Sequence, residues 1–171
     1  MSPMDISKPR RLGRHFLTDH LSGRRKFSSL ALKRIQDAVA AGERLHEGQV
    51  RFAVEASLAL TQVFRGVEPR ARALQLFGQL GVWDTEHNNG VLVYVLLADR
   101  DVEIVADRGI NRRVAQEAWD AICHGMERAF SEGRFEEGAI EGVSAVGELL
   151  AQHFPRSAPG PNELPDTPVV L

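Results

Sequence analysis

Residues 89–107, NGVLVYVLLADRDVEIVAD, contain the two strands that decide the fold. The run from Val91 to Ala98 is apolar at every position, which is typical of a strand covered on both faces. Residues 99–101 form a short polar turn, and apolar and polar side chains then alternate from Val102 to Asp107. The stretch therefore predicts a β-hairpin whose first strand is the central strand of the sheet.

The segments before the hairpin predict another strand and two helices. Residues 49–55 alternate apolar and polar side chains, which is the pattern of a half-buried strand. Helical spacing predicts one helix over residues 28–45, behind a serine, and another that starts at Glu68-Pro69 and ends at Gly81. Because a helix joins the strand at 49–55 to the hairpin, the two strands that it connects are expected to run parallel.

Two amphipathic helices are predicted after the hairpin, one from about Ala115 to Phe130 and one from Phe135 to Leu150. The complete order of elements predicts an α/β fold. In it, a small mixed β-sheet, built from one crossover and one hairpin, is sandwiched by amphipathic helices.

The chain has 171 residues, of which 43% are hydrophobic and 26% are charged, and this composition excludes a wholly disordered or fibrous protein. We expect one α/β domain over residues 28–154, preceded by a basic arm at 1–27. Residues 155–171 are rich in proline and are expected to be disordered. The single cysteine, Cys123, excludes an intramolecular disulfide.

The charge is distributed unevenly along the chain. Residues 1–26 contain seven Lys or Arg against two Asp, whereas the net charge of the whole chain is -2. Residues 8–26 are therefore expected to contact anionic lipid. No nucleic-acid partner is expected, because this arm lacks interleaved aromatic residues. No apolar run approaches the ~20 residues of a membrane span, and no secretory signal is found. We therefore expect a cytoplasmic protein, peripheral at the inner membrane face.

The predicted topology brings three polar segments to one edge of the sheet, which we call the rim: residues 42–48, 83–90 and 107–109. The rim is rich in carboxylates and amides, the oxygen ligands that Ca²⁺ and Mg²⁺ take in proteins. The alternative interpretation is that these residues cap turns or are solvated. Asp107 in particular suits either a metal ligand or the N-cap of a following helix.

Motifs for catalysis are sparse. The sequence contains no Gly-rich phosphate cradle and no CxxC, HExxH or GxSxG pattern. His46 and His87 are candidates for acid–base catalysis because an unperturbed histidine titrates near pH 6.5, but single histidines in loops are more often surface groups.

The stretches GERLHEGQVRFAVEASL and FGQLGVWDTEHNNGVLVYVLLADRDVEIVADRGI resemble the TPM domain, in its short bacterial form without a transmembrane helix. The resemblance covers roughly residues 28–150 and rests on the Asn-Asn-Gly-Val-Leu start of an apolar strand, the polar hairpin turn and the strand that ends in Asp-Arg-Gly. It implies a small α/β sandwich with a mixed sheet. It also implies acid phosphatase activity or roles in membrane complexes, with a divalent metal in some members. The rim positions to which it assigns the metal are Glu43, Asp84, Glu86, Asn88, Asn89 and Asp107.

Two functions are consistent with these residues. The favoured one is an accessory module whose Ca²⁺ or Mg²⁺ site orders the loops for a protein partner, such as a membrane protein complex. The alternative is a metal-dependent acid phosphatase that acts on phosphomonoesters. In it, Asp84 and Asp107 would hold the metal, and Glu86 or His87 would carry the proton, so that Glu86, His87 and Asp107 are the catalytic candidates.

Overall fold

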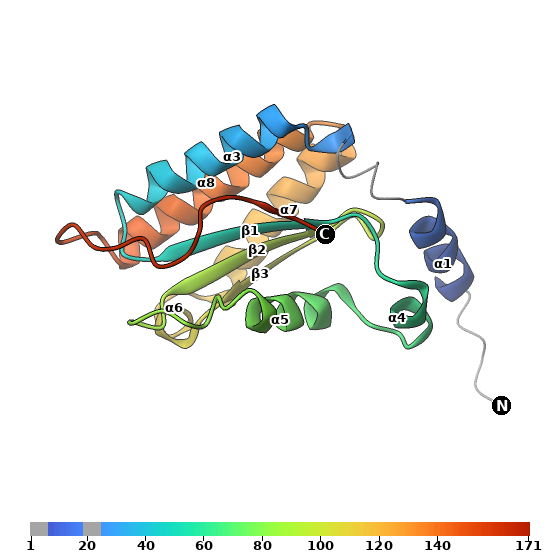
Figure 1. The fold of residues 1–171 in the computed structure, drawn as a ribbon, viewed down its shortest axis with the longest axis horizontal. Coiled ribbons are helices and arrows are strands. Elements are labelled where there is room, and N and C mark those ends of the chain that lie inside the picture. Colours follow the sequence, from blue (N-terminus) through green and yellow to red (C-terminus); the bar gives the residue numbers. More distant parts are fainter. Residues whose placement is uncertain (1–6, 19–24) are drawn as a thin grey trace.

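The computed structural model describes residues 7–18 and 25–171 and contains a four-stranded mixed sheet (Figure 1). Its strands are β1 (Gln49–Glu55), β2 (Gly90–Leu96), β3 (Asp101–Ala106) and β4 (Val169–Val170), in the order β3-β2-β1-β4. β1 runs parallel to β2, and β2 runs antiparallel to β3. The predicted crossover and hairpin are therefore confirmed.

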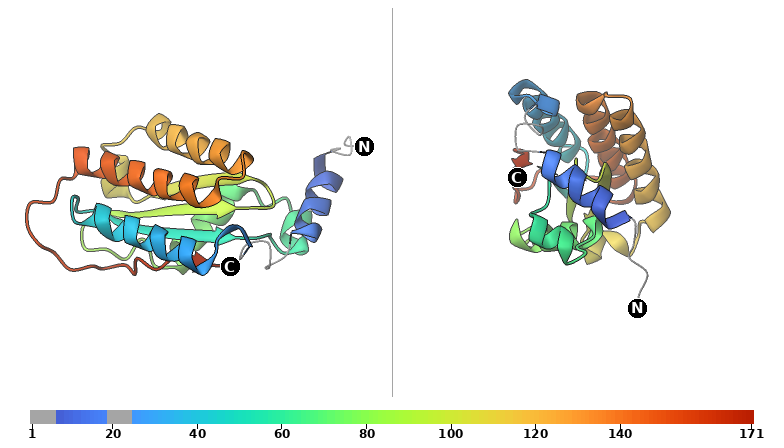
Figure 2. Two further views of the ribbon diagram at one scale, coloured as in Figure 1. Left: turned by 90° about the horizontal axis from the view of Figure 1, so that it is seen from above. Right: turned by 90° about the vertical axis from the view of Figure 1, so that its right-hand side faces the viewer.

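Helices cover both faces of the sheet (Figures 1 and 2). One face carries α3 (Ser29–Glu43), α7 (Gln116–Ser131) and α8 (Phe135–His153), and the other carries α5 (Pro69–Gln79). Along β2, Val93 belongs to the core under the three helices, whereas Leu92 belongs to the core under α5. Because both faces are covered, every residue of β2 is buried, as its unbroken apolar run predicts.

β1 is also buried at every position, although its alternating pattern predicts a half-buried strand. Its polar side chains have partners on both α5 and the C-terminal segment, where the carbonyls of Pro165 and Thr167 accept hydrogen bonds from Arg51 Nη1. Glu55 accepts hydrogen bonds from Arg72 Nε and Nη2, both at 2.8 Å, and from the Tyr94 hydroxyl at 2.7 Å. An alternating strand is thus fully covered because α5 supplies the countercharge for Glu55 and the C-terminal segment supplies acceptors for Arg51.

The C-terminal segment differs from the disordered tail that the sequence predicts. It follows the outer edge of β1 and ends in β4, which pairs with Ala53 and Val54. Leu164 is buried, and Gln49 Oε1 accepts hydrogen bonds from the backbone N–H groups of Glu163 and Leu164 at 2.8 and 3.1 Å. The tail is ordered because it completes an open sheet edge that residues far away in the sequence create.

Three further helices in the described part of the chain are α1 (Ser7–Leu17), α4 (Leu60–Phe64) and α6 (Arg108–Asn111). α1 packs against α4 beside the sheet end where β1 finishes (Figure 1). The predicted arm at 1–27 is therefore helical in part, and its last residue, Phe27, is 2% exposed within the core under α3, α7 and α8. Residues 1–6 and 19–24 of this arm lie outside the described residues. In the described part of the chain, no helix has the length and apolar character of a membrane span.

Candidate functional site

The rim lies at the sheet end where β1 and β2 begin and β3 finishes. The parallel register places Gln49 beside Gly90, and the antiparallel register places Ala106 beside Val91. The backbone N–H of Asp107 donates to the carbonyl of Gly90 at 2.8 Å. The predicted convergence of residues 42–48, 83–90 and 107–109 at one end of the sheet is therefore confirmed.

Two glycines allow the rim segments to pack closely. A Cβ atom on Gly90 would lie 1.9 Å from the carbonyl oxygen of Val82, and one on Gly109 would lie 2.5 Å from that of Asn88. Both distances are too short for any side chain, so only glycine fits at these positions. The Gly109 N–H donates to the Asn88 carbonyl at 3.0 Å, and this contact joins α6 to the loop before β2.

Asp107 caps helix α6 and is buried, with 7% exposure. Its Oδ1 accepts a hydrogen bond from the Arg108 N–H at 2.6 Å. Its Oδ2 is also buried but has no hydrogen-bond partner among the described residues. The N-cap interpretation of Asp107 is therefore correct for one carboxylate oxygen, and the other remains available to a ligand.

Asn89 precedes β2 and is buried, with 5% exposure. Its backbone N–H donates to Thr85 Oγ1 at 3.0 Å, and its side-chain Nδ2 donates to the Glu47 carbonyl. Its Oδ1 is buried without a partner in the described part of the chain. Asn89 thus ties the loop before β2 to the segment before β1 and keeps an unused amide oxygen.

Glu43 ends α3 and lies on a different side of the rim. Gln49 N–H donates to the Asn89 carbonyl, so the next N–H on β1, that of Val50, points away from β2. Glu43 Oε1 accepts this outward N–H at 2.7 Å. Asp107 follows β3 on the far side of β2, so the fold separates Glu43 from Asp107. Burial raises the pKa of Glu43 to about 8, although the Val50 hydrogen bond opposes this rise.

The remaining predicted ligands, Asp84, Glu86 and Asn88, are exposed in the loop before β2, as is the catalytic candidate His87. Asn88 has a φ of 53°, in the left-handed region that asparagine tolerates. The Glu86 N–H donates to Glu163 Oε2 at 2.8 Å, which joins this loop to the C-terminal tail. The loop and the tail enclose a cavity of about 170 Å³, whose lining includes Glu86, His87, Asn89 and Arg156.

His46 is a rim residue whose surroundings the sequence does not reveal. It is 1% exposed and lies in a slot between α3 and α8, where a Cβ on Gly42 or Gly147 would approach its Nε2 to 3.2 or 3.6 Å. Burial lowers its pKa to about 4, so the ring is neutral near pH 7. No local pattern indicates this packing, because His46 follows the end of α3 and Gly147 lies on distant α8.

The rim as a whole offers oxygen atoms, but they do not form a carboxylate cluster. Within residues 7–18 and 25–171, no three His, Cys, Asp or Glu side chains lie close enough together to hold a metal ion. The oxygens that fit a hard cation are of other kinds: one carboxylate oxygen of Asp107 and one amide oxygen of Asn89. Glu43 does not fit, because its carboxyl group is occupied by Val50 and holds a proton near neutral pH.

Comparison with known proteins gives a family and a fold. The model of the TPM domain (TPM_phosphatase) matches residues 26–149. The chain matches none of the curated proteins.

Two solved structures share the fold. The NMR structure of the BA42 protein from the psychrophilic bacterium Bizionia argentinensis has 29% identity and a TM-score of 0.74, over 84% of this chain and 94% of that chain. The solution NMR structure of the N-terminal domain of a P. gingivalis protein has 22% identity and a TM-score of 0.60, over 75% of this chain and 79% of that chain. The mixed sheet with helices on both faces is therefore shared with both proteins.

Proposed function

Because the chain belongs to the TPM domain family, we propose that it is an accessory interaction module that binds Ca²⁺ or Mg²⁺ at the rim and acts on a protein partner at or near a membrane. The observation that carries the cation site is Asp107 Oδ2, a buried carboxylate oxygen without a partner among the described residues. A buried carboxylate without full compensation is costly, and a cation is an effective compensation.

Asp107 and Asn89 are the side chains that would hold the cation, together with backbone carbonyls of the loop before β2. The carbonyls of His87 and Asn88 face the start of α6, as their short distances from a Cβ on Gly109 show. A bound cation supplies positive charge between loop and helix. In this proposal Asp107 anchors α6, Asn89 anchors the loop, and their joint ordering shapes the surface that a protein partner recognises.

The membrane part of the proposal rests on charge. Residues 1–26 carry seven basic residues against two acidic ones, and each basic residue near an anionic surface contributes attraction of about 1 kcal/mol. An assignment to the cytoplasmic side follows from the same attraction, because anionic lipids of the inner leaflet face the cytoplasm.

Phosphomonoester hydrolysis is the second candidate function, and the cavity between loop and tail favours it. Glu86 and His87 line this cavity and supply groups for proton transfer, while Arg156 supplies a positive charge for a phosphoryl group. We expect hydrolysis of p-nitrophenyl phosphate by the purified chain, lost in His87→Ala, if this function is correct. Equal turnover by wild type and variant would assign the activity to a contaminant.

The experiment that tests the cation site is a titration with Ca²⁺ and Mg²⁺ followed by backbone amide NMR. We expect saturable shifts at residues 87–90 and 107–110. Asp107→Asn should abolish them while α6 stays folded, because asparagine caps a helix as well as aspartate does. Asp120→Asn, the same change at an exposed position of α7, is the matched control and should leave the shifts in place. The absence of shifts with both ions, or unchanged shifts in Asp107→Asn, would refute the cation site.

A further inference from the structure

We propose that α1 and α4 together form a docking surface for an anionic membrane, with Phe16, Leu17 and Phe64 inserted at the lipid headgroup boundary. This inference rests on the membrane part of the proposed function and is independent of the cation site. The proposed function invokes only the net positive charge of residues 1–26, whereas this inference assigns the membrane contact to one face of the folded protein.

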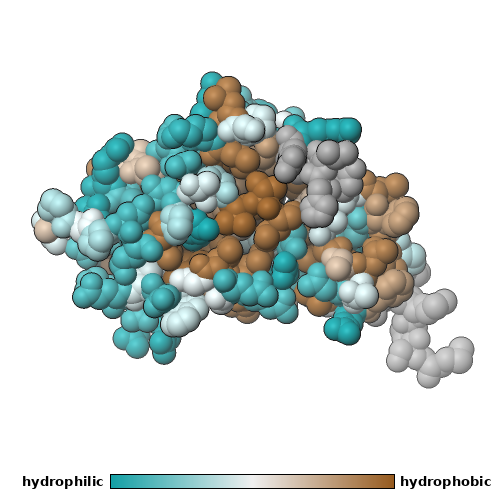
Figure 3. Space-filling model, viewed as in Figure 1, coloured by the Kyte–Doolittle hydropathy of each residue, from teal (hydrophilic) through white to brown (hydrophobic). Residues whose placement is uncertain are grey.

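The two helices carry a concentration of exposed apolar side chains. Phe16 and Leu17 on α1 are 74% and 80% exposed, and Phe64 and Leu60 on α4 are 69% and 39% exposed. Because α1 packs against α4, these side chains belong to one end of the molecule. Figure 3 shows brown, apolar side chains gathered at that end, over the position of α1 and α4 in Figure 1. Contiguous exposed apolar surface of this kind marks an interaction site.

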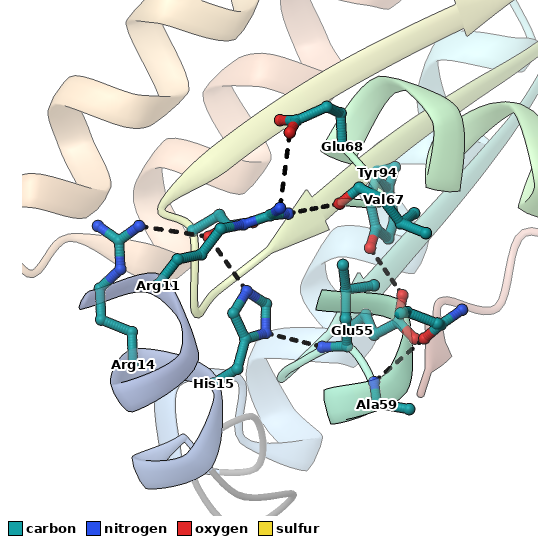
Figure 4. A network of polar contacts seen from close by, with 11 residues as sticks. Arg11, Arg14, His15, Glu55, Ala59, Val67, Glu68 and Tyr94 are labelled. Atoms are coloured by element: carbon teal, nitrogen blue, oxygen red, sulfur yellow. Dashed lines mark hydrogen bonds and ion pairs between the residues drawn. The ribbon is translucent and has the colours of Figure 1, made fainter. Parts of the chain in front are cut away.

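A buried polar network holds α1 in one orientation (Figure 4). His15 is 3% exposed, its Nδ1 accepts the Leu58 N–H at 3.0 Å, and its Nε2 lies 3.1 Å from Asp99 Oδ1. Arg11 donates to Asp99 Oδ2 at 2.7 Å and to the Val67 carbonyl at 2.6 Å. Since these contacts occupy the inner face of α1, the neighbouring Phe16 and Leu17 are held outward. Their exposure thus follows from the way α1 packs against the rest of the folded protein.

The charges around the apolar side chains select the partner. Arg10, Arg14 and Arg65 are exposed on the same two helices or directly after them. The neighbouring Glu68 lies 3.6 Å from Arg11, the arginine that also pairs with Asp99. Apolar side chains flanked by arginines are typical of helices that lie in the interface of an anionic bilayer. A second copy of the chain would bring the same arginines against these, so charge repulsion disfavours a dimer through this face.

Vesicle cosedimentation at low salt tests the surface with the full chain. The vesicles contain phosphatidylcholine alone, or phosphatidylcholine with about one third phosphatidylglycerol. We expect the wild-type chain to bind the anionic vesicles and to bind neutral ones far more weakly. The double variant Phe16→Ser with Leu17→Ser should bind the anionic vesicles at least about tenfold more weakly, because its apolar contact with lipid is lost. Arg10→Gln with Arg65→Gln should weaken the preference for anionic lipid, because two exposed positive charges of this surface are lost.

The matched control is Leu45→Ser, since Leu45 is 65% exposed at the opposite end of the sheet, between α3 and β1. It should bind as the wild type does. All variants should keep the wild-type circular dichroism and melting temperature, because each altered side chain is exposed.

Three outcomes overturn the inference, and they are distinct. If the full chain binds neither vesicle, the membrane part of the proposed function fails with it. If the Phe16/Leu17 variant binds the anionic vesicles as the wild type does, the membrane association holds and the docking surface is wrong. If sedimentation equilibrium reveals a dimer that the Phe16/Leu17 variant abolishes, the face is an interface between copies of this chain.

Discussion

Arg11 and Asp99 form an ion pair across 88 residues of sequence: Nη2 lies 2.7 Å from Oδ2, and Nε lies 3.1 Å from Oδ1. Burial alone would raise the pKa of Asp99, but the hydrogen bonds from Arg11 and His15 and the charge of Arg11 outweigh it and lower this pKa. The pair therefore links the N-terminal helix to the β2–β3 turn and determines where α1 lies.

Replacing Arg11 by methionine should loosen α1. The change keeps most of the apolar stem but leaves Asp99 with a buried charge and weaker compensation, so we expect a loss of about 2 kcal/mol in the free energy of unfolding. Urea denaturation measures this loss, and hydrogen exchange of the amides in α1 locates it. Arg10→Met, on the exposed side of the same helix, should change neither the free energy of unfolding nor the exchange of the α1 amides. Unchanged protection of α1 in Arg11→Met would contradict the anchoring role.

Glu43 should make the protein less stable as the pH rises. Burial raises its pKa from 4.5 to about 8 in the folded state, so between these values the folded chain holds a proton that the unfolded chain has lost. The free energy of unfolding therefore falls as the pH increases through this window, by up to roughly 1.4 kcal/mol per pH unit from this group.

Glu43→Gln should flatten this dependence, because glutamine keeps an acceptor for the Val50 N–H and has no proton to lose. Urea denaturation at a series of pH values from about 5 to 8 measures it. Glu117→Gln, at an exposed position of α7, is the charge-matched control and should retain the wild-type dependence of stability on pH. A slope that survives in Glu43→Gln would assign the dependence to another group.

Gly90→Ala and Gly125→Ala should change stability in opposite directions. The Cβ on Gly90 would lie 1.9 Å from the Val82 carbonyl, so the rim backbone must shift, at a cost of about 3 kcal/mol. Gly125 lies within α7 with nothing within 4 Å of its Cβ position, so alanine should stabilise the helix by about 0.5–1 kcal/mol. Thermal melts of the two variants measure both effects. If Gly90→Ala is as stable as the wild type, the expected clash with the Val82 carbonyl is wrong.

Leu164→Ala should release the C-terminal tail. Leu164 is 5% exposed and packs in the core under α5, so its truncation should cost about 2 kcal/mol. The Leu171 N–H donates to the Val54 carbonyl at 2.9 Å, and we expect faster hydrogen exchange of this amide. Leu74→Ala, at a leucine that is 52% exposed, is the control and should leave the hydrogen exchange of the Leu171 amide slow. An equally slow Leu171 amide in Leu164→Ala would show that β4 pairs without this anchor.

Much of the fold was predictable because its signals are local. The apolar run from Val91 to Ala98, the polar turn after it and the Pro69 helix start each depend on neighbouring residues. The short connections then restrict the strand order, so the crossover and hairpin follow. The tail was not predictable, since Leu164 and the two residues of β4 are isolated apolar positions among prolines. Their binding site is the edge of β1, more than 100 residues earlier in the chain.

The candidate site was predictable in its position but not in its chemistry. Strand directions place Asn89 and Asp107 at one sheet end, as the sequence indicates. The separation of Glu43 from them depends on which way the Val50 N–H points, and alternating backbone directions in the folded sheet decide that.

The sequence alone thus determined the elements, the pairing of the central strands and the end of the sheet at which the polar loops meet, since periodicity is local and the hairpin and helical crossover allow few strand arrangements. Only the tertiary structure decided which polar atoms have partners: Asp99 is held by Arg11, Glu43 by Val50, and one oxygen of Asp107 by none of the described residues. Burial and hydrogen bonding of these groups depend on residues that are distant in the chain, and no local pattern encodes them.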